Sequence, residues 1–204
     1  MKKMFLASSF KDVAGLFKQF EEDVTGKRVT FIPTASAVEK VVFYVASGKK
    51  ALEKMGLIVD ELDVSTASIA DINDKLANND YIYISGGNTF YLLQELKRSG
   101  ADKIIITQVN AGKLYIGESA GSMVVSPNLE YASAMDSTKK APVLDSYEGL
   151  NLTDFYTVPH HTNAPFKKAA EKIKDKYASS LTLCPISNDE AVLVRGDEIE
   201  VKSC

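Results

Sequence analysis

A serine between two glycines is the residue of this sequence best suited to covalent chemistry. The run Gly117-Glu118-Ser119-Ala120-Gly121 follows a strand-like segment, residues 113–116, and precedes residues 122–125, which could begin a helix. A serine on such a strand-to-helix turn exposes its hydroxyl beneath free backbone N–H groups. Because a serine hydroxyl is a poor nucleophile alone, the motif predicts catalysis only if a base lies within hydrogen-bonding reach.

Histidine is the natural candidate for that base, since its ordinary pKa lies nearest neutrality. The chain has only two histidines, His160 and His161. Residues 154–159 alternate in polarity and end in proline, which predicts a strand that delivers His160 at its carboxyl end. Sites collect at that end of the strands in parallel α/β sheets. The alternative is a loop histidine pair without a catalytic role.

A glycine pair supplies a second feature, in Ser85-Gly86-Gly87-Asn88-Thr89-Phe90. Two glycines let the backbone approach a ligand closely, and Asn88 or Thr89 can cap the following helix. With a serine nucleophile, we expect the N–H groups of Gly87 and Ala120 to form an oxyanion hole. A plain tight turn is the alternative. Neither phosphate-binding fingerprint is present, so we predict no bound cofactor.

The elements that must position these residues alternate between strands and helices. Strands are expected near residues 4–8, 29–33, 57–64, 81–84 and 113–116. Helices are expected between them, including a long one with apolar residues from Val38 to Met55 that Gly56 ends. A last helix after Pro165 precedes short β candidates at 181–183, 191–194 and 198–201. This rhythm predicts an α/β fold, a mostly parallel sheet with helices on both faces, in one domain spanning 1–204.

Composition excludes several classes of function. A net charge of −3 and scattered lysines argue against binding to nucleic acid. No apolar run approaches the length of a membrane span, and the apolar start is too short for a signal peptide, so we expect a cytoplasmic protein. Cys184 and Cys204 have no metal or redox spacing, and we expect no metal site. Cys184, in an apolar run, is expected to be structural.

Taken together, the motifs resemble those of the peptidase E (S51) family of serine peptidases, relatives of cyanophycinase. The matching segments are Phe31-Ile32-Pro33-Thr34-Ala35-Ser36, Gly86-Gly87-Asn88-Thr89-Phe90, Gly117-Glu118-Ser119-Ala120-Gly121 and Pro159-His160. The resemblance implies a three-layer fold akin to the class I glutamine amidotransferases. It also implies a Ser-His-acid triad that cleaves short peptides near their N-terminus, with Ser119 as nucleophile and His160 as base.

The family places the triad acid in the loop after the serine, which favours Asp136, with Glu130 as second choice. Family members that prefer an N-terminal aspartate carry an arginine shortly after the histidine, whereas no arginine lies between Arg98 and Arg195 here. We therefore expect a short-peptide substrate without aspartyl preference, and a monomer or homodimer. The alternatives are an esterase-type α/β hydrolase, or a non-catalytic relative that binds a peptide or small acid.

Overall fold

A seven-stranded sheet forms the centre of the computed structural model, which describes residues 1–204. The strand order is β3-β2-β4-β5-β1-β8-β9. The first five strands in this order are parallel, whereas β8 is antiparallel to both β1 and β9. The strands are β1 (Lys3–Ala7), β2 (Arg28–Ile32), β3 (Ile58–Glu61), β4 (Tyr81–Ile84), β5 (Leu114–Glu118), β8 (Glu190–Arg195) and β9 (Glu198–Ser203). The predicted mostly parallel sheet is confirmed.

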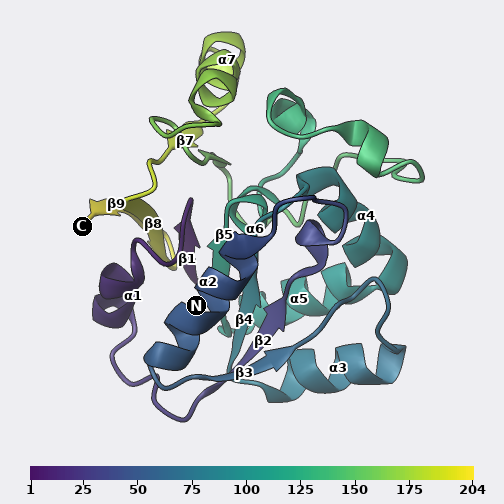
Figure 1. The fold of residues 1–204 in the computed structure, drawn as a ribbon, viewed down its shortest axis with the longest axis vertical. Coiled ribbons are helices and arrows are strands. Elements are labelled where there is room, and N and C mark those ends of the chain that lie inside the picture. Colours follow the sequence, from purple (N-terminus) through teal and green to yellow (C-terminus); the bar gives the residue numbers. More distant parts are fainter.

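Helices cover both faces of this sheet, with α1 and α2 on one face and α3, α4 and α5 on the other (Figure 1). The α-helices are α1 (Ala14–Phe20), α2 (Phe43–Lys54), α3 (Ile69–Asn78), α4 (Thr89–Ser99), α5 (Ala101–Asn110), α6 (Ala120–Met123) and α7 (Lys167–Tyr177). Short 3-10 turns are η1 (Thr34–Ser36), η2 (Glu130–Ala134) and η3 (Thr138–Lys140). The result is the three-layer α/β sandwich that the alternating pattern predicts.

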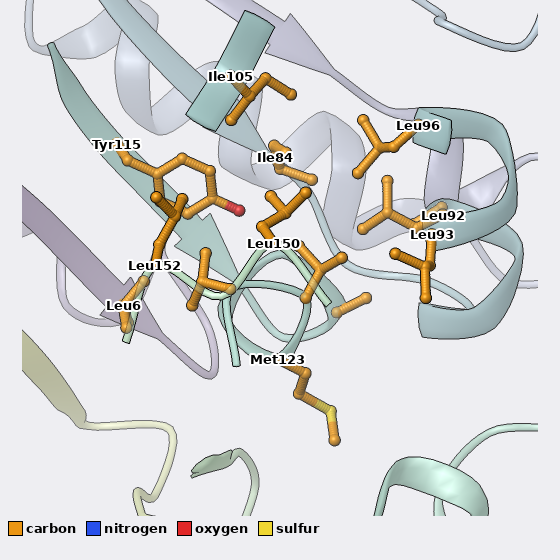
Figure 2. Close-up of a cluster of buried hydrophobic side chains, with 14 of the residues drawn as sticks. Leu6, Ile84, Leu92, Leu93, Leu96, Ile105, Tyr115, Met123, Leu150 and Leu152 are labelled. Carbon is orange, nitrogen blue, oxygen red and sulfur yellow. The ribbon is translucent and has the colours of Figure 1, made fainter. Parts of the chain in front are cut away.

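The strands bury both faces because successive side chains point to opposite sides. In β1, Phe5 joins the core beneath α1 and α2, whereas Met4 and Leu6 join the core beneath α3, α4 and α5. Figure 2 shows the second core, where leucines of α4 lie toward Ile84 of the sheet and Leu152 lies near Tyr115. Burial of this kind stabilises by about 25 cal/mol per Å² of apolar surface. The sheet is therefore a rigid base for the loops at its carboxyl edge.

The helix predicted to begin near Val38 begins instead at Phe43. Val41 and Val42, which we expected on its buried face, are 59% and 45% exposed. Residues 34–36 form the η1 turn immediately after β2, and the chain then runs along the carboxyl edge of the sheet before α2 begins. The helical spacing of the valines is thus coincidental, and Val41 lies beside the cavity described below.

A second, two-stranded sheet pairs β6 (Tyr156–Val158) with β7 (Leu183–Pro185) in parallel. β7 begins two residues later than predicted, while the strands predicted at 191–194 and 198–201 are present as β8 and β9. In Figure 1, β7 and α7 lie beyond the ends of the central strands toward which β1 points. This part of the chain therefore stands over the carboxyl edge of the sheet. None of the helices is long and apolar enough to span a bilayer.

Candidate active site

Ser119 occupies the turn between β5 and α6, with backbone angles φ 51° and ψ −106°. Few residues with a side chain adopt a positive φ, and such strain persists only where the surrounding structure holds it. Here Ser119 N–H donates to Ala7 O of β1 at 2.9 Å, and Ser122 Oγ donates to Ala7 O and Gly117 O. The turn is therefore fixed to two adjacent strands of the central sheet, as the G-x-S-x-G motif predicts.

The two glycines of the motif are required by close packing. A Cβ on Gly117 would lie 2.6 Å from Gly121 O, and one on Gly121 would lie 2.1 Å from Ile84 O. Both distances are far below van der Waals contact, so any larger residue would displace backbone. The short helix α6 can pack directly on β4 only because residue 121 has no side chain.

His160 lies opposite the serine, with His160 Nε2 3.0 Å from Ser119 Oγ. It also has a positive φ, 59°, so two of the three non-glycine residues with positive φ form this pair. His160 N–H donates to Ser8 Oγ at 3.0 Å, and the Phe166 ring stacks on the imidazole at 5.0 Å between centroids. The predicted convergence of serine and histidine is present. As predicted, β6 ends just before His160, although β6 belongs to the small sheet.

Asn188 is the third member of this constellation, and sequence reasoning missed it. His160 Nδ1 lies 2.7 Å from Asn188 Oδ1. The two side chains meet because β6 and β7 are parallel and in register, Val158 opposite Pro185, so the segments after them emerge together. With Oδ1 accepting from Nδ1–H, the other ring nitrogen is free to accept the serine proton.

Asp136 does not contact the histidine, so the expectation that it is the triad acid is wrong for this geometry. Asp136 Oδ2 accepts instead from Thr89 N–H at 2.8 Å and from Thr89 Oγ at 2.6 Å. The residue between η2 and η3 is directed to the N-terminus of α4, where a carboxylate is favoured. Glu130, the second choice, is exposed at the start of η2 and does not line the cavity.

The protonation of His160 is shifted by its surroundings. Burial lowers the pKa of His160 below its ordinary value, and the hydrogen bond to Asn188 opposes this effect. Unlike a carboxylate, the Asn188 amide carries no charge to stabilise the imidazolium. The ring is therefore neutral at physiological pH, the form that can accept a proton.

The loop at Gly87 carries a backbone N–H without a protein acceptor close to the serine. Gly87 has φ 139°, and a Cβ there would lie 2.2 Å from Ala35 O, so only glycine fits. Its N–H donates to no protein acceptor. The Ala120 N–H is the first amide of α6 and has no acceptor within that helix. A Cβ on neighbouring Gly86 would lie 3.2 Å from Ser119 Cβ, so this loop passes directly beside the serine.

A cavity of about 650 Å³ opens over the serine and the histidine. Its wall includes exposed apolar side chains, among them Val41, Phe43 and Phe166. Its two lysines are each paired with a carboxylate, Lys11 with Asp12 at 2.8 Å and the other with Glu39 at 2.6 Å. No arginine lines the cavity. The site therefore suits a small ligand with apolar groups better than an acidic side chain.

Glu118, the residue before the serine, is a buried carboxyl group in the wall of this cavity. It accepts hydrogen bonds from Tyr83 OH at 2.7 Å and from Phe10 N–H at 2.9 Å. Burial raises the pKa of Glu118 to about 7, although both hydrogen bonds act in the opposite direction. The charge of Glu118, adjacent to Ser119 in the chain, thus changes near neutral pH.

The remaining candidate groups lie apart from this chemistry. His161 Nε2 contacts Lys174 Nζ at 3.1 Å and does not line the cavity. Cys184 is a half-buried residue of β7, and burial raises the pKa of its thiol to about 11, which suppresses the reactive thiolate. No group of three or more His, Cys, Asp or Glu side chains is arranged to hold a metal ion.

Fold and site together define a three-layer α/β protein whose serine and histidine meet at the carboxyl edge of the sheet. Residues 4–202 match the family model of peptidase family S51. An uncharacterised peptidase of Listeria monocytogenes is 58% identical over 202 residues, covering 99% of this chain and 98% of that protein. Peptidase E of a Nostoc species is 31% identical over 140 residues, 68% of this chain and 54% of that protein.

Solved structures agree with this relationship. A crystal structure of a Listeria monocytogenes protein provisionally described as a peptidase E superposes with a TM-score of 0.97 at 57% identity, covering 100% of this chain and 99% of that one. A peptidase from an acI-B1 actinobacterium shares the fold, with a TM-score of 0.73 at 23% identity over 100% of this chain and 88% of that one. The chain belongs to peptidase family S51, and the family predicted from its motifs is confirmed.

Proposed function

We propose that this protein is a serine peptidase that hydrolyses short peptides, as a dipeptidase or N-terminal exopeptidase, through an acyl-enzyme. The observation that carries the proposal is the 3.0 Å contact between His160 Nε2 and the hydroxyl of Ser119, on a turn with positive φ. Nucleophile and base within this distance, with the base held by a third group, are the signature of an activated serine.

In the proposed reaction, His160 Nε2 takes the proton of Ser119 as the oxygen attacks the scissile carbonyl carbon. The N–H groups of Gly87 and Ala120 donate to the carbonyl oxygen, which becomes an oxyanion. When the tetrahedral intermediate collapses, the C–N bond breaks and His160 gives its proton to the departing amine. Water, deprotonated by His160, then attacks the acyl ester, and the peptide acid leaves while Ser119 recovers its proton.

In place of the Ser-His-acid triad expected from the family, we propose a Ser-His-Asn arrangement. Asn188 fixes the tautomer and the orientation of the imidazole through the 2.7 Å contact with Nδ1. A neutral orienting group does not stabilise the imidazolium by charge, so the ring remains easy to deprotonate. This arrangement is chemically sufficient, because the Asn of papain-like peptidases has the same task.

The test is the reaction of the wild type and two serine variants with dipeptides and with a fluorophosphonate probe. We expect Ser119→Ala to abolish both hydrolysis and labelling, since no other serine hydroxyl contacts a histidine ring nitrogen. Ser137→Ala is the matched control, because Ser137 also lines the cavity and contributes only its backbone oxygen, to Asn88 Nδ2. Hydrolysis that survives Ser119→Ala would refute the proposal. A parallel panel of nitrophenyl esters distinguishes a peptidase from an esterase.

A further inference from the structure

Four acidic residues line the cavity: Asp12, Glu39, Glu118 and Asp136. Asp12 and Glu39 form ion pairs with lysines, and both carboxylate oxygens of Glu118 accept hydrogen bonds, which leaves Asp136. Its Oδ2 accepts both hydrogen bonds from Thr89, at 2.8 and 2.6 Å. Its Oδ1 has no hydrogen-bond partner in the protein and is not fully buried, and the residue lines the cavity. One oxygen is thus held in place, while the other is left without a partner at the wall of the space that a substrate would fill.

No lysine or arginine forms an ion pair with this carboxylate, and Lys140, whose charge acts on it, is itself bonded to Glu39. The two lysines of the cavity form ion pairs with other acids, Lys11 with Asp12 and Lys140 with Glu39. Burial raises the pKa of Asp136, although the hydrogen bonds from Thr89 and the charge of Lys140 act in the opposite direction. Even Tyr44, across the same cavity, has a pKa raised to about 12, by its burial and by the charges of Glu39, Glu118 and Asp136. A positive group on the ligand would complement this wall.

The distance from the serine limits which positive group can reach Asp136. The Gly86 backbone passes beside the Ser119 side chain, and Thr89, which holds Asp136, is three residues further along the same loop. Three residues span about 10 Å at most. At about 3.5 Å per residue, a peptide whose scissile carbonyl lies over Ser119 covers this span with only a few residues before the bond.

We propose that Asp136 binds the protonated α-amino group of the substrate and so restricts cleavage to a bond close to the free N-terminus. This inference rests on the proposed peptidase function and names the feature that its substrates share, a free N-terminus. A peptide α-ammonium has a pKa of about 8 and is charged at neutral pH whatever the first side chain. Asp136 is then a specificity-determining residue, placed by Thr89.

The test compares leucyl-leucine with N-acetyl-leucyl-leucine, chosen because the cavity wall is apolar. Binding is measured by calorimetry with Ser119→Ala protein, which keeps the cavity but lacks the nucleophile. We expect acetylation to weaken binding about 10- to 100-fold, the range of a hydrogen bond between charged groups. Asp136→Asn in this background should weaken binding of the free peptide by a similar factor and leave the acetylated peptide unchanged.

Asp136→Asn retains an oxygen that can accept from Thr89, so the loop stays anchored. Asp145→Asn is the matched control, an exposed carboxylate of the same connecting segment outside the cavity. Equal binding of both peptides, binding of neither, or equal losses for both in Asp136→Asn would overturn the inference. Fluorophosphonate labelling of Asp136→Asn with Ser119 intact reports separately on the serine. If the probe fails to label the wild type while the free and acetylated peptides still bind differently, the proposed peptidase mechanism is refuted and the inference about Asp136 stands.

Discussion

Replacing the buried Glu118 by glutamine should change the pH dependence of stability in a way that isolates one carboxyl group. Glu118 has an ordinary pKa of 4.5 in the unfolded chain and about 7 in the folded protein, because burial disfavours its charge. At about 1.4 kcal/mol per pH unit, this difference corresponds to about 3 kcal/mol. The stabilising state is the protonated one.

The sign follows from proton binding. Between pH 4.5 and about 7 the folded protein holds the Glu118 proton and the unfolded chain has released it. The free energy of unfolding of the wild type therefore falls as the pH rises through this window. Glutamine has the same shape and no charge, so the variant lacks this loss. We expect the variant to gain about 3 kcal/mol relative to the wild type between pH 4 and pH 8.

Urea denaturation of both proteins at half-unit pH steps measures this difference directly. A constant offset is expected, since glutamine cannot accept from both Tyr83 and Phe10 as the carboxylate does. Only the slope of the difference against pH is diagnostic. Glu171→Gln, which removes an exposed carboxylate on α7, should show no slope. A pH-independent difference for Glu118→Gln would refute the argument that burial keeps this group protonated.

Three further substitutions test the framework of the site. Asn188→Ala should lower kcat about 10- to 100-fold, because it removes the acceptor for His160 Nδ1–H. Asn188→Asp should move the acidic limb of the kcat/KM profile to higher pH, because a carboxylate favours the imidazolium. Identical pH profiles for Asn188→Asp and the wild type would refute this role of Asn188. Gly121→Ala should destabilise by about 1–3 kcal/mol in urea, because the new Cβ meets Ile84 O, and an unchanged midpoint would contradict the packing. Ser8→Ala should lower stability by about 1–2 kcal/mol and also lower kcat, and unchanged kcat would show that Ser8 does not position His160.

The fold could be predicted from the sequence because the patterns that define its strands, turns and helix caps are local. Strands such as β4 are continuous apolar runs, the glycine pair leads into α4, and Asn88 caps that helix by accepting from Tyr91 N–H at 2.9 Å. The same local pattern misled at the start of α2, where Val41, at helical spacing, lines the cavity instead. A substrate cavity also needs apolar residues, and periodicity alone does not distinguish that use from a helix core.

Only part of the site could be predicted from the sequence, because one of its residues depends on how distant strands pair. Ser119 and the glycines of its turn carry their own packing constraints, so their motif predicts their geometry. The partner of His160 depends instead on the pairing of β6 with β7, strands far apart in the sequence. Asn188 is a neutral amide, and it follows His160 in the chain instead of lying between Ser119 and His160. The sequence feature that could have pointed to Asn188 is the short apolar strand ending at Pro185, which polar Ser187 and Asn188 follow after one residue.

Ser8 explains how two separate sheets hold one reaction centre. Its hydroxyl donates to Ile186 O at 3.1 Å and accepts from His160 N–H at 3.0 Å, so it joins the ends of both small-sheet strands. Ser8 directly follows Ala7, whose carbonyl accepts from Ser119 N–H. Ser119 and His160 are therefore both held by hydrogen bonds at the same end of β1. Since a displacement of about 1 Å can cost a hundredfold in rate, this common anchor matters more to the chemistry than to the stability.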